Sequence, residues 1–159
     1  MLDVGSMAPE FAAPDQDGKE RKLADYRGRW LLLYFYPKDD TPGCTAEACA
    51  LRDSWSDFEK TGAAVLGVSK DSVKSHGKFA AKYGLPFTII SDEDRAIIRA
   101  YGADGLIRRV SYLIDPEGKI AKAYPKVKPA GHAAEVLADL AELRKLGQGT
   151  AVDGATNPR

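Results

Sequence analysis

The sequence predicts an α/β protein in which a mixed β-sheet is covered by helices on both sides. Three observations support this class. Short β-rich runs alternate along the chain with helical patterns, and the strongest of these runs are apolar throughout, as in strands that are buried on both faces. At 159 residues the chain is also long enough to bury the core of one domain. The expected order of elements is βαβαβαββα.

The first predicted strand and helix lie next to each other. The run "RWLLLYFYP" (29–37) is continuously apolar and ends at Pro37, which suits the end of a strand. After it, apolar residues recur at spacings of three and four, the pattern of one helix face. These residues are Cys44, Ala48, Leu51, Trp55 and Phe58. We therefore expect one helix that begins near residue 42 and ends near Thr61.

The middle of the chain predicts two further strands with a helix between them. The run "AAVLGVS" (63–69) and the run "FTIIS" (87–91) are both short and apolar. Residues 72–83 between them predict a helix that Gly84 stops.

The last third of the chain predicts a short helix, a hairpin and a final helix. Residues 94–101 form the short helix. The runs at 108–115 and 119–125 flank "PEG" and predict two strands joined by a tight turn. One apolar helix face follows, formed by Val136, Leu137, Leu140 and Leu143.

The predicted domain covers residues 1–146. From Gly147 onward, the segment "GQGTAVDGATNPR" (147–159) has few apolar groups with which to order itself. We expect a flexible C-terminal tail there.

Composition limits the setting of the protein. Lys and Arg together number 23, as do Asp and Glu, so the net charge of zero disfavours nucleic acid as a partner. The chain has no basic start followed by an apolar stretch, and no window approaches the ~18 apolar residues of a membrane span. We expect a soluble cytoplasmic protein with no membrane partner. In that reducing compartment a cysteine pair is more often catalytic, redox-active or metal-binding than structural.

Cys44 is a candidate nucleophile. Thr41 is a good N-cap, Pro42 suits the first helical position, and Gly43 lets another group approach the backbone, so Cys44 falls in the first turn. The unpaired amides and the positive end of the helix dipole there favour a thiolate over a thiol. The alternative is that Cys44 and Cys49, the two cysteines of the chain, are small core residues.

Cys49 stands five residues after Cys44 in the same predicted helix. On an ideal helix this spacing places the two Cα atoms roughly 8.6 Å apart, whereas a disulfide needs less than ~7 Å. If the two cysteines bond, the first turns of the helix must therefore unwind.

A metal or nucleotide cofactor is not expected. His76, a helix-surface or boundary residue, and His132, near the start of the last helix, lie on separate predicted helices, and two cysteines do not make four zinc ligands. The acidic run at 91–95 is explained by Ser91 or Asp92 capping a helix. The chain also has no glycine-rich phosphate loop.

The segment "YPKDDTPGCTAEACALRD" resembles the active-site segment of peroxiredoxins, in which Pro37, Thr41 and Cys44 match the family pattern at every spacing. The step to Cys49 resembles the bacterioferritin comigratory protein, or peroxiredoxin Q, subfamily. The similarity extends over almost all of residues 5–146. It implies a thioredoxin-like fold with an N-terminal extension.

The resemblance also implies roles for individual residues. Cys44 would be the peroxidatic cysteine, which attacks the O–O bond and becomes a sulfenic acid. Cys49 would be the resolving cysteine and form the Cys44–Cys49 disulfide. Thr41 would hydrogen-bond the sulfur and the incoming peroxide, and Pro37 would shape the pocket. Arg109 would hold the thiolate and the charge that develops on peroxide oxygens.

Two assignments stay open on the sequence. Arg108 and Arg109 should point to opposite faces of a strand, so a slip of register would exchange their roles. Glu47 either orients the arginine or is an ordinary exposed helix residue. Tyr112 and Tyr124 stand where the family often has Phe and Trp, which leaves the preferred peroxide undetermined.

The expected activity is that of a thiol peroxidase acting on hydrogen peroxide and organic hydroperoxides, recycled by thioredoxin or a similar dithiol protein. The resemblance implies no metal, flavin or haem, and a monomer. One alternative is a thiol–disulfide reductase, although that chemistry usually uses C-x-x-C and this chain has C-x-x-x-x-C. A second alternative is a non-enzymatic redox sensor or chaperone module, in which the disulfide only signals.

Overall fold

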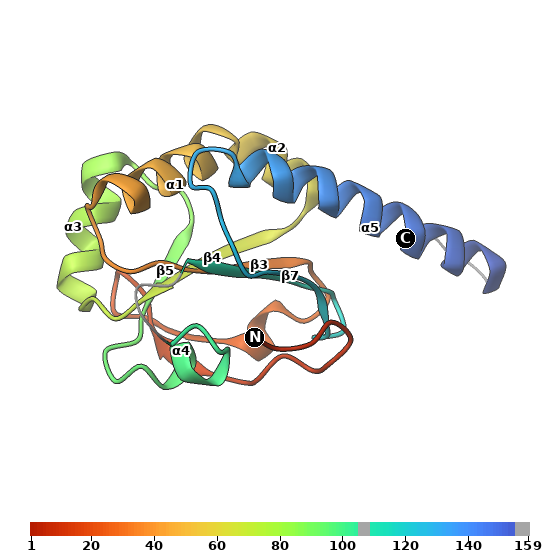
Figure 1. Cartoon of the computed structure of the whole chain (residues 1–159), viewed down its shortest axis with the longest axis horizontal. Coiled ribbons are helices and arrows are strands. Elements are labelled where there is room, and N and C mark those ends of the chain that lie inside the picture. Colours follow the sequence, from red (N-terminus) through yellow and green to blue (C-terminus); the bar gives the residue numbers. More distant parts are fainter. Residues whose placement is uncertain (105–108, 155–159) are drawn as a thin grey trace.

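A five-stranded mixed sheet forms the centre of the molecule, with a layer of helices on one face and the N-terminal segment on the other (Figure 1). The computed structural model describes residues 1–104 and 109–154, with side chains up to residue 145. The strand order is β5-β4-β3-β6-β7. The expected α/β class with a mixed sheet is confirmed.

The central strands occupy the predicted runs. They are β3 (Leu31–Phe35), β4 (Ala64–Ser69), β5 (Thr88–Ser91), β6 (Val110–Ile114) and β7 (Ile120–Tyr124). Strand β3 pairs in parallel with β4 and antiparallel with β6, and β6 and β7 form the predicted hairpin. All of β3 is buried, because its alternate side chains face two different hydrophobic clusters.

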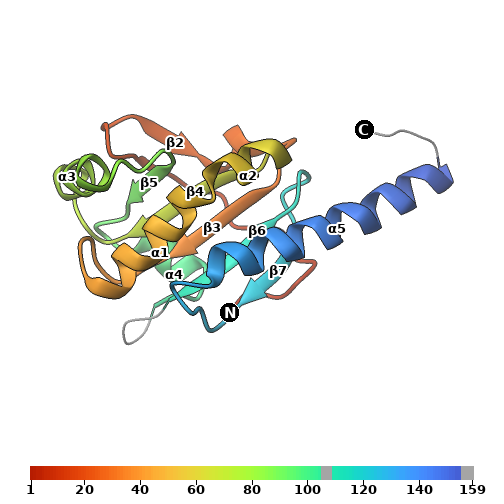
Figure 2. The same ribbon diagram turned by 90° about the horizontal axis from the view of Figure 1, so that it is seen from above.

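Four helices cover one face of the sheet (Figure 2). They are α1 (Pro42–Asp53), α2 (Trp55–Thr61), α3 (Val73–Tyr83) and α5 (His132–Gly154). Leu32 and Tyr34 of β3 pack against this layer together with Ala48 and Leu51 of α1 and Val136 of α5. The site described below lies in this layer.

The N-terminal segment covers the opposite face and is the extension that the resemblance implied. Met7 forms a bridge with Lys119 beside β7, and Asp15 forms a bridge with Ile90 of β5, so the segment crosses the sheet from edge to edge. It contains a small hairpin and a 3-10 helix, and α4 completes the layer. These elements are β1 (Ala12–Pro14), β2 (Glu20–Lys22), η1 (Leu23–Tyr26) and α4 (Ala96–Ala100).

The prediction of one helix as far as Thr61 is wrong at Ser54. There φ is −98° and ψ is 9°, which ends α1, and α2 begins at the next residue. The apolar spacing from Leu51 to Phe58 continues across the break, and no Gly or Pro marks it. The sequence pattern therefore could not reveal it.

The predicted start of the tail also differs from the structure. Helix α5 continues past residue 147 to Gly154 and projects beyond the sheet (Figures 1 and 2). A helix that is already nucleated adds one backbone hydrogen bond for each further residue, so it can extend through a segment that has few apolar residues. Residues 155–159 lie outside the described residues, and the separation of a tail from the domain stays a prediction.

In the described part of the chain, no helix combines the length and the apolar character that a membrane span requires.

Candidate active site

Cys44 lies in the first turn of α1, on the side that faces the sheet. Its side chain is 2% exposed, and α1 begins two residues before it, with Thr41 at the N-cap position. The amides of the first turn have no partners within the helix, and they carry the positive end of its dipole. The surroundings therefore favour a negative charge on the sulfur.

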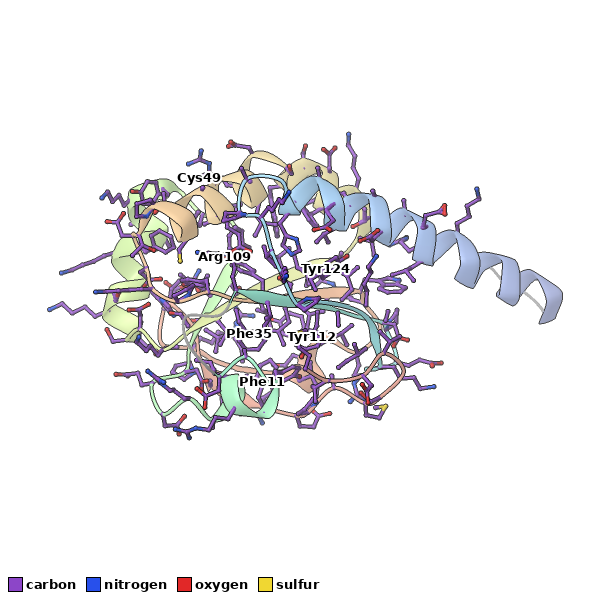
Figure 3. The ribbon with its side chains drawn as sticks, in the orientation of Figure 1. Phe11, Phe35, Cys49, Arg109, Tyr112 and Tyr124 are labelled. Carbon is purple, nitrogen blue, oxygen red and sulfur yellow. The ribbon has the colours of Figure 1, made fainter. Side chains whose placement is uncertain are left out.

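Arg109 brings a positive charge to the sulfur of Cys44 from the side of the sheet. Its Nη1 atom donates hydrogen bonds to Cys44 Sγ at 3.4 Å and to Glu47 Oε1 at 3.1 Å. The residue immediately precedes β6, and the pairing of Val110 with Phe35 places it at the end of β3. Figure 3 shows Arg109 between the sheet and α1. The alternative residue, Arg108, lies outside the described residues.

Glu47 is buried, so the interpretation as an exposed helix residue is wrong. It is 1% exposed, pairs with Arg109, and leaves its Oε2 atom without a hydrogen-bond partner. Burial raises the pKa of Glu47 to about 7, although Arg109 opposes this shift. The sequence contained a signal for this position, because Glu47 stands on the same helix stripe as Cys44 and Leu51.

Thr41 occupies the expected N-cap position, but its hydroxyl caps no amide of the helix. Thr41 Oγ1 instead donates to the carbonyl of Lys38 at 2.9 Å. That bond commits the hydroxyl proton, so Thr41 bonds the loop in front of the helix rather than the sulfur. Its oxygen keeps lone pairs that can accept a hydrogen bond from the O–H of a bound hydroperoxide. Pro37 is half-buried in the bend that follows β3.

Cys49 is half-buried, and both cysteines are free thiols. It belongs to the same unbroken helix as Cys44, and Figure 3 shows it on the outer side of α1. The spacing argument from the sequence therefore applies to this state, in which the helix holds the two cysteines apart.

Gly43 is required by the close approach of Arg109. A Cβ atom at this position would lie 2.7 Å from Arg109 Nη2. Alanine normally stabilises a helix relative to glycine by about 0.5–1 kcal/mol. Here it would instead displace the guanidinium from the sulfur.

We expect Gly43→Ala to fold normally and to react roughly 10- to 100-fold more slowly with peroxide, because a displaced charged group loses its alignment. Stopped-flow kinetics and thermal unfolding measure the two properties. Gly131→Ala is the control, since a Cβ atom there meets nothing within 4 Å. Equal rates for both variants would contradict the expectation.

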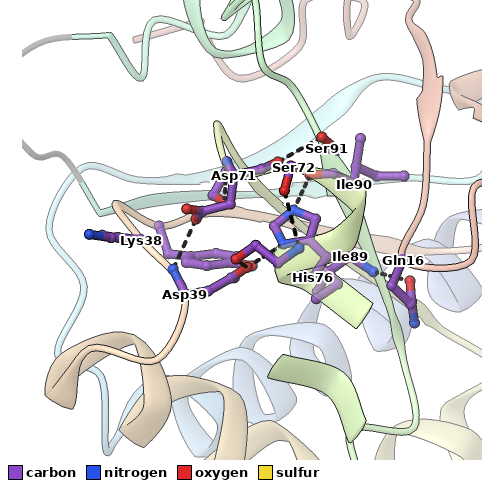
Figure 4. Close-up of polar contacts among 12 residues, drawn as sticks. Gln16, Lys38, Asp39, Asp71, Ser72, His76, Ile89, Ile90 and Ser91 are labelled. Atoms are coloured by element: carbon purple, nitrogen blue, oxygen red, sulfur yellow. Dashed lines mark hydrogen bonds and ion pairs between the residues drawn. The ribbon is translucent and has the colours of Figure 1, made fainter. Parts of the chain in front are cut away.

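A buried hydrogen-bond network under the loop that leads into α1 was not predicted from the sequence (Figure 4). His76, expected at a helix surface or boundary, is fully buried. Its Nδ1 lies 2.7 Å from Asp39 Oδ2, and its Nε2 lies 2.9 Å from the carbonyl of Ile90. Both nitrogens face acceptors, so Nε2 donates to Ile90 and a proton lies between Nδ1 and Asp39.

This network contains carboxylate and imidazole atoms that could bind a metal ion, but these atoms already take part in hydrogen bonds. Atoms of Asp39, Asp71 and His76 lie within 4.8 Å of one another, close enough to share an ion. However, Ser75 donates to Asp39, and the amide of Asp39 and the hydroxyl of Ser69 donate to Asp71. A metal would have to displace these bonds. We therefore assign the network to holding the loop in place.

A second contact that was not predicted from the sequence holds the same loop at the protein surface. Asp40 has a positive φ of 55°, which is uncommon outside glycine. Its carboxylate accepts bonds from Lys82 at 2.7 Å and from the hydroxyl of Tyr83 at 2.6 Å. Arg52, near the end of α1, donates to the carbonyl of the same Tyr83. The C-terminal end of α3 thus contacts the loop before α1 and the C-terminal end of α1.

A thioredoxin-like fold that holds a buried cysteine at a helix N-terminus, with an arginine bound to the sulfur, defines the class of cysteine-dependent peroxidases. The AhpC/TSA family model matches residues 4–123. The chain belongs to this family of peroxiredoxins, within its Bcp/PrxQ subfamily.

Relatives of known sequence cover most of the chain. A putative peroxiredoxin bcp of Coxiella burnetii is 49% identical over 150 residues, which are 87% of this chain and 99% of the relative. Peroxiredoxin Bcp of Escherichia coli is 42% identical over 147 residues, covering 86% of this chain and 94% of the relative.

Solved structures agree with the fold. A cysteine-to-serine mutant of PrxQ from Xylella fastidiosa superposes with a TM-score of 0.87 at 36% identity, covering 91% of this chain and 98% of that chain. A bacterioferritin comigratory protein of Xanthomonas campestris, described for its alkyl peroxide reduction activity, gives a TM-score of 0.83 at 39% identity, covering 89% and 99%. The present chain is therefore a peroxiredoxin and a thiol peroxidase.

Proposed function

We propose that Cys44 is the peroxidatic cysteine of this enzyme. The observation that carries the proposal is the pair of hydrogen bonds from Arg109 Nη1 to Cys44 Sγ and to Glu47. The thiolate attacks one peroxide oxygen, so an S–O bond forms while the O–O bond breaks. The departing oxygen takes a proton and leaves as water or an alcohol, and Cys44 becomes a sulfenic acid. Arg109 stabilises the charge that develops on these oxygens.

The neighbouring side chains shape this step. Thr41 Oγ1 accepts a hydrogen bond from the O–H of the hydroperoxide, because its own hydrogen is donated to the carbonyl of Lys38. Pro37 has no N–H and a fixed φ, so it forms an apolar wall of the entrance. Alkyl hydroperoxides are proposed as substrates together with hydrogen peroxide, in line with the activity named for the Xanthomonas campestris relative.

Cys49 is proposed as the resolving cysteine. Its thiol condenses with the sulfenic acid of Cys44, so the intramolecular Cys44–Cys49 disulfide forms and water leaves. A dithiol protein such as thioredoxin then reduces the disulfide. All of the proposed site residues come from one chain, so a monomer suffices for the cycle.

A peroxide-consumption assay with thioredoxin and its reductase tests the proposal against the alternatives. We expect continuous turnover of hydrogen peroxide. Insulin reduction without peroxide turnover would indicate a thiol–disulfide reductase instead. A single stoichiometric oxidation with every reductant tried would indicate a sensor.

Disulfide formation is expected to melt the first turns of α1, since the intact helix keeps the two Cα atoms too far apart for a disulfide. Hydrogen exchange should show the amides of residues 44–52 protected in the reduced protein and fast in the oxidised protein. Strands β3 and β4 should change little, because they are buried at the centre of the sheet.

Peptide mapping of the oxidised protein is the companion measurement. A Cys44–Cys49 bond with intact protection of residues 44–52 would contradict local unfolding, and so would the absence of that bond.

A further inference from the structure

The site holds two acidic groups and one basic group. Cys44 and Glu47 both accept a hydrogen bond from the same nitrogen of Arg109. In the described residues no other basic side chain has a hydrogen bond or ion pair with either group. One guanidinium can balance one negative charge, so a thiolate and a carboxylate together would leave a buried net charge of −1.

The carboxyl group is the partner less able to carry this charge. Glu47 is 1% exposed, and its Oε2 atom has no hydrogen-bond partner. An ionised carboxylate would lose the hydration of that oxygen and gain nothing in return. Burial correspondingly raises the pKa of Glu47 to about 7, even with Arg109 beside it. The sulfur, in contrast, lies at the positive end of a helix.

The other titratable groups considered around Cys44 and Glu47 cannot take up the proton of the Cys44 thiol at neutral pH. On β3, the hydroxyl of Tyr34 is buried without a partner. Burial and then the charges of Glu47 and Cys44 raise the pKa of Tyr34 well above its usual value, so it stays neutral. The histidine on α5, His132, interacts with Ser111, Glu135 and Asp139 rather than with Cys44 or Glu47, and burial lowers its pKa. These contacts leave Glu47 as the proton acceptor for the thiol.

We propose that Glu47 holds the proton of Cys44 in the resting enzyme and releases it when the thiolate is consumed. On formation of the resting state, the S–H bond breaks and an O–H bond forms on Glu47, so the net charge of the site does not change. When the thiolate attacks ROOH, the peroxide proton stays on the sulfenic acid. Glu47 then gives its proton to the alkoxide RO⁻, which becomes ROH. Glu47 is left as a carboxylate.

This proposal rests on Cys44 as the reacting cysteine, but its test needs no turnover. The Cys49→Ser enzyme, which leaves only one thiol, is reduced and alkylated with iodoacetamide at about pH 8 in weak buffer, with a pH indicator to count protons. In the resting enzyme the neighbouring thiolate keeps Glu47 protonated at this pH, because two like charges disfavour each other. Once alkylation has removed the thiolate charge, the pKa of Glu47 of about 7 lies below the pH of the experiment, so the carboxyl should ionise.

We expect nearly one proton to be released per alkylated Cys44. When Glu47→Gln is added, we expect no proton release. Cys44 is then already a thiolate before alkylation, and the glutamine holds no proton that alkylation could free. Glu59→Gln is the matched control, since Glu59 is exposed on α2, and it should still release one proton. In infrared difference spectra, alkylation should remove the carbonyl band of a protonated carboxyl, and Glu47→Gln should lack this band.

The other outcomes overturn the proposal. One proton released with and without Glu47→Gln would show that the proton resides on a Cys44 thiol. No proton released in either protein would show that Glu47 is ionised beside the thiolate and only orients Arg109. Failure of Cys44 to act as the peroxidatic residue would appear separately, as turnover that survives Cys44→Ser.

Discussion

Cys44→Ser is expected to abolish peroxide turnover, because a serine hydroxyl in the same place is neither ionised at neutral pH nor able to form the sulfenic acid. The residue is almost fully buried at the start of α1, and serine is close to cysteine in size, so the fold should survive. Peroxide consumption with thioredoxin as reductant measures the effect, and circular dichroism checks the fold.

Cys49→Ser is the paired variant for this experiment. It should react once with peroxide, at a rate near that of the wild type, and then stall with thioredoxin, because no disulfide can form. Its sulfenic acid should also be oxidised further to sulfinic acid at high peroxide. If the Cys44 variant were as active as the wild type, Cys44 could not be the peroxidatic residue.

Arg109→Met is expected to slow the reaction with peroxide by roughly 10²–10³-fold. Methionine keeps much of the side-chain bulk but removes the charge that contacts Cys44 Sγ and Glu47. A pre-organised charged donor at such a position is worth about 3–4 kcal/mol in the transition state, which corresponds to this factor. Stopped-flow measurement of the first oxidation, in the Cys49→Ser background, isolates the affected step.

Arg99→Met provides the control for the loss of a positive charge. Arg99 belongs to α4, on the opposite face of the sheet, and its side chain is 62% exposed. Its replacement should leave the rate of oxidation unchanged. A large loss of rate in this variant, or none in Arg109→Met, would show that the contact with Cys44 is not what accelerates the reaction.

Local patterns in the sequence were sufficient for most of the elements. The apolar run that became β3 is buried on both faces, and Gly84 ends α3 in the left-handed conformation that glycine favours. Asp92 was one of two candidate caps for the short helix after β5, and it accepts bonds from the amides of Ile97 and Ile98. Each of these features depends on residues close together in the chain.

The elements that were missed depend on contacts with distant parts of the chain. Strands β1 and β2 have three residues each, too few for an alternating pattern, and the bridge from Asp15 to β5 fixes their position on the sheet. The break at Ser54 and the continuation of α5 to Gly154 likewise have no local sequence signal.

The same distinction applies to the site. The sequence by itself determined the motif of Pro37, Thr41 and Cys44 and the spacing to Cys49, because these residues occupy one continuous segment whose helix geometry follows from local rules. Only the tertiary structure decided that Arg109, 65 residues away, contacts the sulfur. It also decided that Glu47 and His76 are buried. Burial and long-range contact follow from how the helices pack on the sheet, and these two quantities control the charge and the proton of a buried group.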